Sequence, residues 1–438
     1  MRVSHVGRLL AVSAFTMLPA FGIPSAQAVS PPGVDDRWLP DPALPAPLRP
    51  TVQREVCAPL TVDAGPGRNP PPEVFDLSEV WRLTRGAGQR VAVIDTGISR
   101  HRRLPDVVPG GDYVSTGDGT QDCDAHGTLV AGIIAATADS KSDGFSGIAP
   151  EATLISIRQS SAKFAVAGDR SRAGVGDVDT MAKAVRTAAD LGASVINISS
   201  VACVPVTTAL DDRALGAALA YAVDVKNAVV VAAAGNTGGA AQCPPQRSDA
   251  TWQTITVAVS PGWYDDYVLT VGSVNAEEAP SAFSLAGPWV DVAAPGEAVT
   301  SLAPDPVSGT SYAAPVVSGL AALIRARFPA LTARQVMQRI ESTAHHPPAG
   351  WDALVGNGTI DPFAAVSTGT GPSTRTPKPS PVAAPATVSP PATAPRDTRP
   401  RDTAVRGAAI CLAALTVALA AGALSSRLRG TRGRVPGD

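Results

Sequence analysis

The chain has 438 residues, a formal net charge of −2 and a sequence pI near 6.2. Because the charges nearly balance and no long basic patch lies outside the termini, composition excludes a nucleic-acid-binding protein. The 41 prolines are concentrated in the two flanks, which predicts one large globular domain between them.

Residues 1–28 have the layout of a secretory signal peptide. Arg2 and Arg8 precede an apolar run over residues 9–23, and Ala-Gln-Ala follows at residues 26–28. We expect cleavage after Ala28. An uncleaved anchor is the alternative, although the run is short for a membrane span. Residues 29–75 are rich in proline and show little periodicity, so they predict an extended arm.

The predicted domain covers residues 76–367 and opens with a capping box at residues 76–79, before a short helix. Residues 90–94 form an apolar, β-branched run typical of a strand buried on both faces of a parallel sheet. Asp95 follows this run directly, at the end of the strand where open α/β sheets place their sites. A loop at 116–125 then leads into a helix that begins near His126.

Further along, predicted strands alternate with predicted helices. The strands are expected at residues 153–157, 194–198, 228–233 and 268–274, and the helices at 179–191 and 210–226. This alternation is the pattern of right-handed crossovers in a parallel sheet. Residues 159–177 interrupt it with a long loop rich in glycine, serine and arginine. A last helix is expected at 332–343, with a threonine cap.

The segment Ser-Gly-Thr-Ser-Tyr-Ala-Ala-Pro, residues 308–315, delivers Ser311 to the start of an apolar helix expected at 316–324. A hydroxyl there lies at the positive end of a helix dipole, beside backbone N–H groups without intrahelical acceptors. Ser311 is therefore a candidate nucleophile. A helix cap is the alternative, because serine is favoured at helix starts whatever the function.

The C-terminal flank predicts a membrane tether. Residues 368–403 have the composition of an unfolded, polyproline-type linker, and residues 404–426 are apolar enough to cross a bilayer. The arginines of the tail at 427–438 predict a cytoplasmic end, which places the domain on the extracytoplasmic side of the cell membrane.

Four motifs occur in the order Asp, His, Asn, Ser. They are Val-Ile-Asp-Thr-Gly at residues 93–97, His-Gly-Thr-Leu-Val-Ala-Gly at 126–132, Ala-Ala-Ala-Gly-Asn at 232–236, and the segment around Ser311. In these motifs the chain resembles the subtilisin-like serine peptidases, peptidase family S8. The resemblance implies an α/β fold of three layers, with a mostly parallel sheet flanked by helices. It also implies a triad of Asp95, His126 and Ser311, with Asn236 in the oxyanion hole.

The same resemblance implies a substrate-binding strand. Ser199, Ser200 and Val201 correspond to it, although the glycine usual after the paired small residues is replaced. Residues 159–177 become an insertion on the rim of the active site. The arm is too short and too rich in proline to form the family's compact inhibitory prosegment, so we expect activity while it is attached. The absence of a defensible acidic cluster predicts that no metal or other cofactor is required.

Four cysteines lie in the exported part, and an oxidising compartment allows three pairings among them. The favoured pairs are Cys57 with Cys123, which would pin the arm, and Cys203 with Cys243, which would join two loops. Free or metal-bound thiols are the alternative, although no C-x-x-C spacing occurs.

With its signal sequence, arm, cysteines and single anchor, the chain resembles the mycosins. These are membrane-anchored subtilisin-like proteases of type VII secretion systems. The resemblance implies secreted protein substrates and contact with components of a secretion channel. A scaffold that steadies or caps the channel, with proteolysis secondary, is the alternative function.

Overall fold

The computed structural model describes residues 29–31, 33–59, 75–139, 145–171, 174–239 and 243–367. The predicted signal peptide at 1–28, linker at 368–403, membrane span at 404–426 and tail at 427–438 lie outside these residues. Within the described part, no helix is long and apolar enough to cross a membrane.

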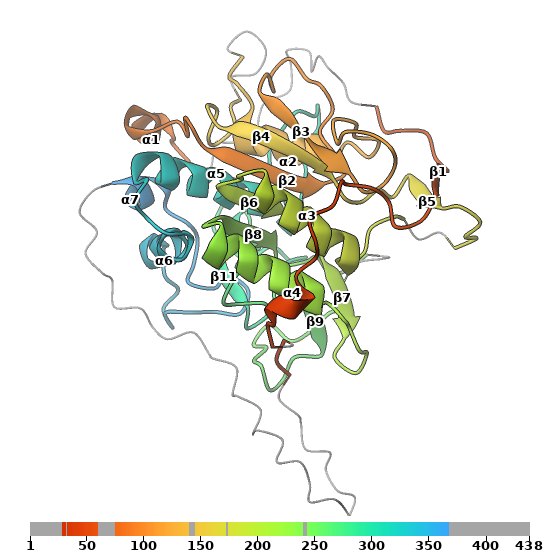
Figure 1. Ribbon diagram of the computed structural model, residues 1–438. Coiled ribbons are helices and arrows are strands. Elements are labelled where there is room, and N and C mark those ends of the chain that lie inside the picture. Colours follow the sequence, from red (N-terminus) through yellow and green to blue (C-terminus); the bar gives the residue numbers. More distant parts are fainter. Residues whose placement is uncertain are drawn as a thin grey trace, which may run out of the picture. The chain divides into compact units, whose positions relative to one another are not determined.

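A seven-stranded parallel sheet forms the centre of the domain (Figure 1). Its strands, in spatial order, are β11 (Val290–Pro295), β10 (Leu269–Val274), β8 (Val229–Ala233), β6 (Val195–Ile198), β2 (Arg90–Asp95), β4 (Thr153–Arg158) and β3 (Val107–Asp112). Every neighbouring pair is parallel. The expected α/β fold with a parallel sheet is therefore confirmed, and Asp95 is the last residue of a central strand.

Helices cover both faces of the sheet. Helices α3 and α4 lie over one face, and α2 and α5 over the other (Figure 1). The helices are α1 (Ser78–Leu83), α2 (His126–Ala135), α3 (Val178–Asp190), α4 (Arg213–Ala220), α5 (Thr310–Arg327), α6 (Ala333–Thr343) and α7 (Pro362–Val366). Because both faces are covered, the central strands are continuous apolar runs without alternation.

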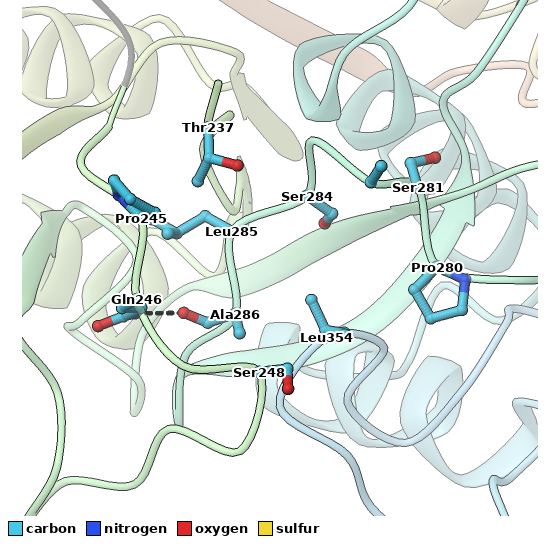
Figure 2. A pocket seen from close by; sticks show the side chains of 11 residues that line it. Thr237, Pro245, Gln246, Ser248, Pro280, Ser281, Ser284, Leu285, Ala286 and Leu354 are labelled. Carbon is cyan, nitrogen blue, oxygen red and sulfur yellow. Dashed lines mark hydrogen bonds between the residues drawn. The ribbon is translucent and has the colours of Figure 1, made fainter. Parts of the chain in front are cut away.

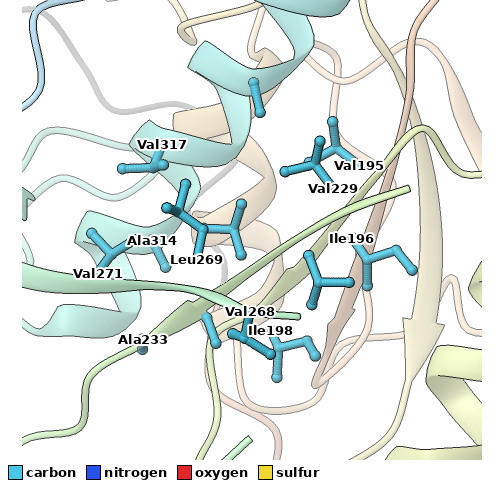
Figure 3. Packing of buried hydrophobic residues seen from close by; sticks show 14 of the residues in the cluster. Val195, Ile196, Ile198, Val229, Ala233, Val268, Leu269, Val271, Ala314 and Val317 are labelled. Atoms are coloured by element: carbon cyan, nitrogen blue, oxygen red, sulfur yellow. The ribbon is translucent and has the colours of Figure 1, made fainter. Parts of the chain in front are cut away.

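The core is densest between α5 and the middle of the sheet. Figure 3 shows Val317 of α5 close to side chains of β6, β8 and β10, among them Val229 and Leu269. Val195, Val229 and Val317 are completely buried. This packing holds the start of α5, where Ser311 lies, against the carboxyl ends of the strands.

Two ribbons were not expected from the sequence. β7 (Ala202–Pro205) pairs antiparallel with β9 (Val257–Ser260), and β1 (Thr51–Gln53) of the arm pairs antiparallel with β5 (Phe164–Val166). The segment 159–177 is therefore not only loop, because it supplies β5 as a partner for the arm. Each ribbon joins segments that are far apart in the sequence, so local patterns carry no signal for the pairing.

The edge strand β3 was also missed. It contains Pro109 and Gly110, which oppose strand formation, and its register to β4 shifts between Pro109 and Gly111. An edge position with a bulge tolerates both residue types.

Several helix boundaries correct the sequence-based expectation. At α1 the expected capping box does not form: the Asp76 carboxylate accepts from Ser78 N at 2.9 Å, and the Glu79 side chain pairs with Arg82 instead. Helix α4 is shorter than expected and continues as a π-helical turn, Tyr221–Val225. The capping threonine of α6 is confirmed, with a reciprocal bond between Thr332 and Gln335.

The arm is tied to the domain at several points. It contains a 3₁₀ turn, Asp36–Trp38, and its strand β1 is followed by Cys57, which is disulfide-bonded to Cys123. Glu55 pairs with Lys163 of the insertion at 2.7 Å. A second disulfide joins Cys203 to Cys243, so both pairs are those favoured from the sequence.

Candidate active site

Asp95 and His126 meet where β2 ends and α2 begins. Asp95 Oδ1 lies 2.7 Å from His126 Nδ1 and also accepts the backbone N–H of Thr96 at 2.7 Å. Asp95 is only 1% exposed, whereas the imidazole keeps 29% of its surface accessible. The carboxylate is therefore a buried orienting group, and the ring faces the solvent side of the site.

Electrostatics favour a proton on this histidine. Burial disfavours the imidazolium, but the charge and hydrogen bond of Asp95, together with the charges of Asp122 and Asp124, outweigh it and raise the pKa of His126. A buried carboxylate beside an imidazole stabilises the charged ring in this way. The arrangement suits a base that must hold a proton for part of a reaction.

Ser311 lies in the first turn of α5, which begins at Thr310 and not near residue 316 as expected. The motif 308–315 is thus mostly helical, with Gly309 as its N-cap. The ring of the next residue, Tyr312, stands 5.2 Å from the His126 ring. The start of α5 is therefore packed beside the histidine, and Ser311 is 8% exposed there.

Pro315 explains how a helix can tolerate a proline so close to the serine. Proline has no N–H, so the carbonyl of Ser311, four residues earlier, loses its intrahelical donor. Ser199 Oγ replaces that donor at 2.9 Å. Ser199 Oγ accepts in turn from Asn197 Nδ2 at 2.9 Å, and Asn197 Oδ1 accepts from Ser318 Oγ at 2.8 Å. A buried chain of hydrogen bonds thus fixes the backbone of Ser311 to β6.

Asn236 has an amide whose orientation is determined by its neighbours. Its Oδ1 accepts from both the N–H and the hydroxyl of Thr310, at 2.9 and 3.0 Å. The Nδ2 group is therefore left to face the other way. A Cβ placed on Gly309 would lie 3.4 Å from Asn236 Nδ2 and 3.1 Å from Ser311 Oγ, so both atoms border one small space.

Gly309 and Thr310 belong to the site but were not singled out in the sequence. Gly309 has φ +153°, and a side chain there would enter the space between Ser311 and Asn236. Thr310 orients the Asn236 amide, and its hydroxyl also accepts from the backbone N–H of Gly235 at 3.1 Å. Their only signal in the sequence is their place inside the motif that carries Ser311.

Comparisons with known proteins agree with this geometry. A profile of the subtilase family, Peptidase_S8, matches residues 86–358. Mycosin-4 of Mycobacterium tuberculosis is 72% identical over 405 residues, which cover 88% of this chain and 89% of that protein. The chain belongs to the subtilase family and, within it, to the mycosins.

Solved structures show the same relationship. The chain matches the MycP3 protease of the type VII (ESX-3) secretion system at 44% identity and a TM-score of 0.70, over 78% of this chain and all of that one. A chain in an intact ESX-5 inner membrane complex matches at 40% identity and a TM-score of 0.72, over 90% of this chain and 100% of the other. This subtilase is therefore a subtilisin-like serine protease.

The segment expected to bind substrate follows β6 of this subtilase. The Ser199 side chain is engaged, because its Oγ donates to the carbonyl of Ser311. The Ser200 Oγ is buried, and none of the described residues hydrogen-bonds it. Val201 is partly exposed and its side chain approaches Gly235. Substrate binding by these residues rests on the resemblance and on their place beside Ser311.

Figure 2 shows the side chains that line a cavity of about 230 Å³. Its walls come from Thr237, from residues 245–248 and 280–286, and from Leu354, and Gln246 Nε2 donates to the carbonyl of Ala286. No ionisable side chain lines it. The side chains that line this cavity therefore offer no group for acid–base chemistry. Among the described residues no group of three or more His, Cys, Asp or Glu side chains is placed to hold a metal ion.

Proposed function

We propose that this chain is a membrane-anchored serine endopeptidase, which hydrolyses peptide bonds of secreted proteins in association with a type VII secretion system. The observation that carries the catalytic part is the hydrogen bond between Asp95 and His126 beside the helix start that holds Ser311. Nucleophile, base and orienting acid of a serine peptidase need this arrangement.

In the proposed reaction, Ser311 Oγ attacks the carbonyl carbon of the scissile peptide bond. His126 Nδ1 is bound to Asp95, so Nε2 is the nitrogen that takes the serine proton. Asp95 holds the ring in that tautomer and stabilises the imidazolium. The imidazolium then protonates the leaving amine, and an acyl-enzyme remains on Ser311. Water, deprotonated by His126, hydrolyses the ester and regenerates the serine.

The oxyanion is stabilised by two donors. Asn236 Nδ2 supplies one, because Thr310 occupies the other end of its amide. The backbone N–H of Ser311 supplies the second, since N–H groups in the first turn of a helix have no intrahelical acceptor. Donors already held in place before the reaction give the largest stabilisation of the developing charge.

Residues 199–201 are proposed to bind the substrate as an added strand. Their backbone leaves the sheet at the carboxyl end of β6, next to Ser311. An extended peptide pairing there would bring its carbonyl to the nucleophile. This contact uses main-chain groups, which suits substrates of varied sequence.

The proposed location rests on the flanks and on the relatives. Residues 1–28 have the layout of an export signal, and residues 404–426 are apolar enough to anchor the chain. A relative at 40% identity forms part of an ESX-5 inner membrane complex. We therefore place the protease domain on the extracytoplasmic side of the cell membrane, beside secretion-channel components.

A serine-directed fluorophosphonate probe tests the catalytic assignment. We expect the exported domain to be labelled and the Ser311→Ala variant to be unlabelled. Ser342→Ala, which alters a serine of α6, is the matched control and should label like the unmodified protein. Labelling that persists in Ser311→Ala would show that another residue is the nucleophile.

A scaffold function is the second candidate. The β1–β5 ribbon and the tether predicted at 368–426 suit a fixed partner better than free digestion of many proteins. A binding role of this kind is compatible with proteolysis and separable from it by experiment.

A further inference from the structure

Helix α2, which carries His126 as its first residue, begins without a side-chain cap of its own. Its N-cap is Ala125, which has φ +67° and no group that can accept a hydrogen bond. The orphan N–H groups of the first turn are bound from elsewhere. Gly127 N donates to Thr96 Oγ1 at 2.9 Å, and Thr128 N donates to Asp122 Oδ2 at 2.8 Å.

Asp122 is a buried carboxylate at the centre of these contacts, with 7% of its surface exposed. Its Oδ2 also accepts from the Thr128 hydroxyl at 2.7 Å. Its Oδ1 accepts from Thr96 Oγ1 at 2.8 Å and from Asp124 N at 3.0 Å. Burial raises the pKa of Asp122, and the hydrogen bonds from Thr128 and Thr96 oppose this effect. All four hydrogen-bonding groups donate to it, which is the pattern of an ionised carboxylate.

These hydrogen bonds run parallel to the contact between Asp95 and His126. Thr96 directly follows Asp95, and Gly127 directly follows His126. The path from Thr96 through Asp122 to Thr128 therefore ties the end of β2 to the first turn of α2, one residue away from the pair. Gly127 makes the close approach possible, since a Cβ there would lie 2.2 Å from the carbonyl oxygen of Gly97.

We propose that Asp122 is a positioning residue for His126, which acts through Thr96 to hold the imidazole in register with Asp95 and adds a second negative charge behind the ring. This inference rests on the proposed peptidase function. Asp122 touches neither substrate nor the reacting atoms. Its effect is exerted on where the ring stands and on how readily the ring is protonated.

The charged and titratable groups that face His126 come from several elements. Asp95 belongs to β2, Asp122 and Asp124 to the loop before α2, and Tyr312 to α5. Burial, with the charges of Asp95 and Asp122, raises the pKa of Tyr312 to about 12, so it is neutral while the histidine titrates. Asp95 makes the direct contact, and the charge of Asp122 also contributes to the raised pKa of His126.

If Asp122 only capped helix α2, its replacement would change the stability of the protein and nothing else. The test therefore measures kcat and the pH profile, which the loss of a cap alone would not change. Asp122→Asn removes the charge and turns an amide N–H₂ toward donors that it cannot satisfy. We expect kcat to fall about tenfold or more, about 1.4 kcal/mol in activation free energy, with a small change in KM. The acid limb of kcat/KM should also shift to lower pH, because the histidine loses a stabilising charge.

Thr96→Val separates the two effects, because it removes the tie and keeps the charge. We expect kcat to fall while the acid limb stays in place. Asp118→Asn is the control. Asp118 is exposed in the same loop, and its side chain accepts from the N–H and hydroxyl of Thr120, so both kcat and the acid limb should match those of the unmodified protein. If Asp122→Asn fails to fold, Thr96→Val with unchanged kcat overturns the proposal.

Unchanged kcat in a folded Asp122→Asn variant would also overturn the proposal. So would a loss of kcat in that variant without a shift in the acid limb of its kcat/KM profile. These failures differ from failure of the proposed function. If the unmodified protein shows no hydrolysis that depends on Ser311, the peptidase assignment is wrong. If it does, and Asp122→Asn behaves normally, only the role of Asp122 is wrong.

Discussion

At the residue scale, the amide of Asn236 illustrates how neighbours prepare a group for one task. Thr310 uses both its N–H and its hydroxyl to hold the amide oxygen. The remaining donor is directed toward the space beside Ser311 before any substrate is present. Such preorganisation reduces the reorganisation that a developing oxyanion would otherwise require.

Asn236→Ala should therefore lower kcat by about 10²–10³, the figure known for such a donor in a subtilisin, with a small effect on KM. Steady-state kinetics on a peptide substrate measure this. Asn227→Ala, at a distant turn where Asn227 Oδ1 accepts from Ala333 N, is a control that should keep kcat. A rise in KM with unchanged kcat would indicate that Asn236 contributes to binding the substrate and gives the oxyanion no additional stabilisation.

The pH dependence of hydrolysis is a second prediction at this scale. In the proposed mechanism, His126 must be neutral to accept the serine proton. Asp95 raises the pKa of His126 against the effect of burial. Activity is thus lost as pH falls through a value above 6.5, the ordinary pKa of histidine. A profile of kcat/KM against pH measures this midpoint. A midpoint below 6.5 would contradict the electrostatic account.

At the element scale, the arm is held close to His126. Cys57 of the arm is bonded to Cys123, three positions before His126, and Ala58 N donates to the carbonyl of Cys123 at 2.8 Å. The carboxylate of Asp124 binds Ser161 and Ala162 of the insertion. The loop at residues 122–125 is thus fixed by both the arm and the insertion.

Replacing Cys57 and Cys123 by serine should destabilise the domain. The bond closes a sequence separation of 66 residues, for which the chain-entropy estimate is about 4 kcal/mol. Urea unfolding of the double variant measures the loss, and its midpoint should fall without a large change in slope. The same midpoint in both proteins under oxidising conditions would show that the bond contributes no stability in solution.

At the scale of the whole molecule, the question is whether proteolysis or binding is the essential role. The chain combines the hydrogen-bonded pair of Asp95 and His126 with an arm and an insertion that join into a two-stranded ribbon. If binding is separable, cells that produce Ser311→Ala should keep secretion that is lost when the whole chain is deleted. Measuring secreted protein in both strains decides this, and equal loss in both would reject the scaffold role.

The sequence by itself predicted the fold class, the order in the chain of the five inner strands of the sheet, and Asp95, His126, Asn236 and Ser311 as candidate residues. It missed β3, the two ribbons, and the part of Gly309 and Thr310 in the site. Continuous apolar runs predict buried parallel strands. Asp95 directly follows such a run, and His126 begins a predicted helix. Ser311 was found in the same way, although α5 begins at Thr310. The helix extends further back than the proline suggested because Ser199 supplies the hydrogen bond that Pro315 cannot make.

The tertiary structure alone decided which distant groups support that site. The Asp122 contacts, the Thr310 contact with Asn236, and the pairing of β1 with β5 all join segments whose local sequence does not refer to one another. Each of these contacts depends on where two distant segments of the chain lie after folding. Local periodicity and propensity therefore do not predict them. The sequence could name candidate residues, but only the fold shows which groups hold them in place.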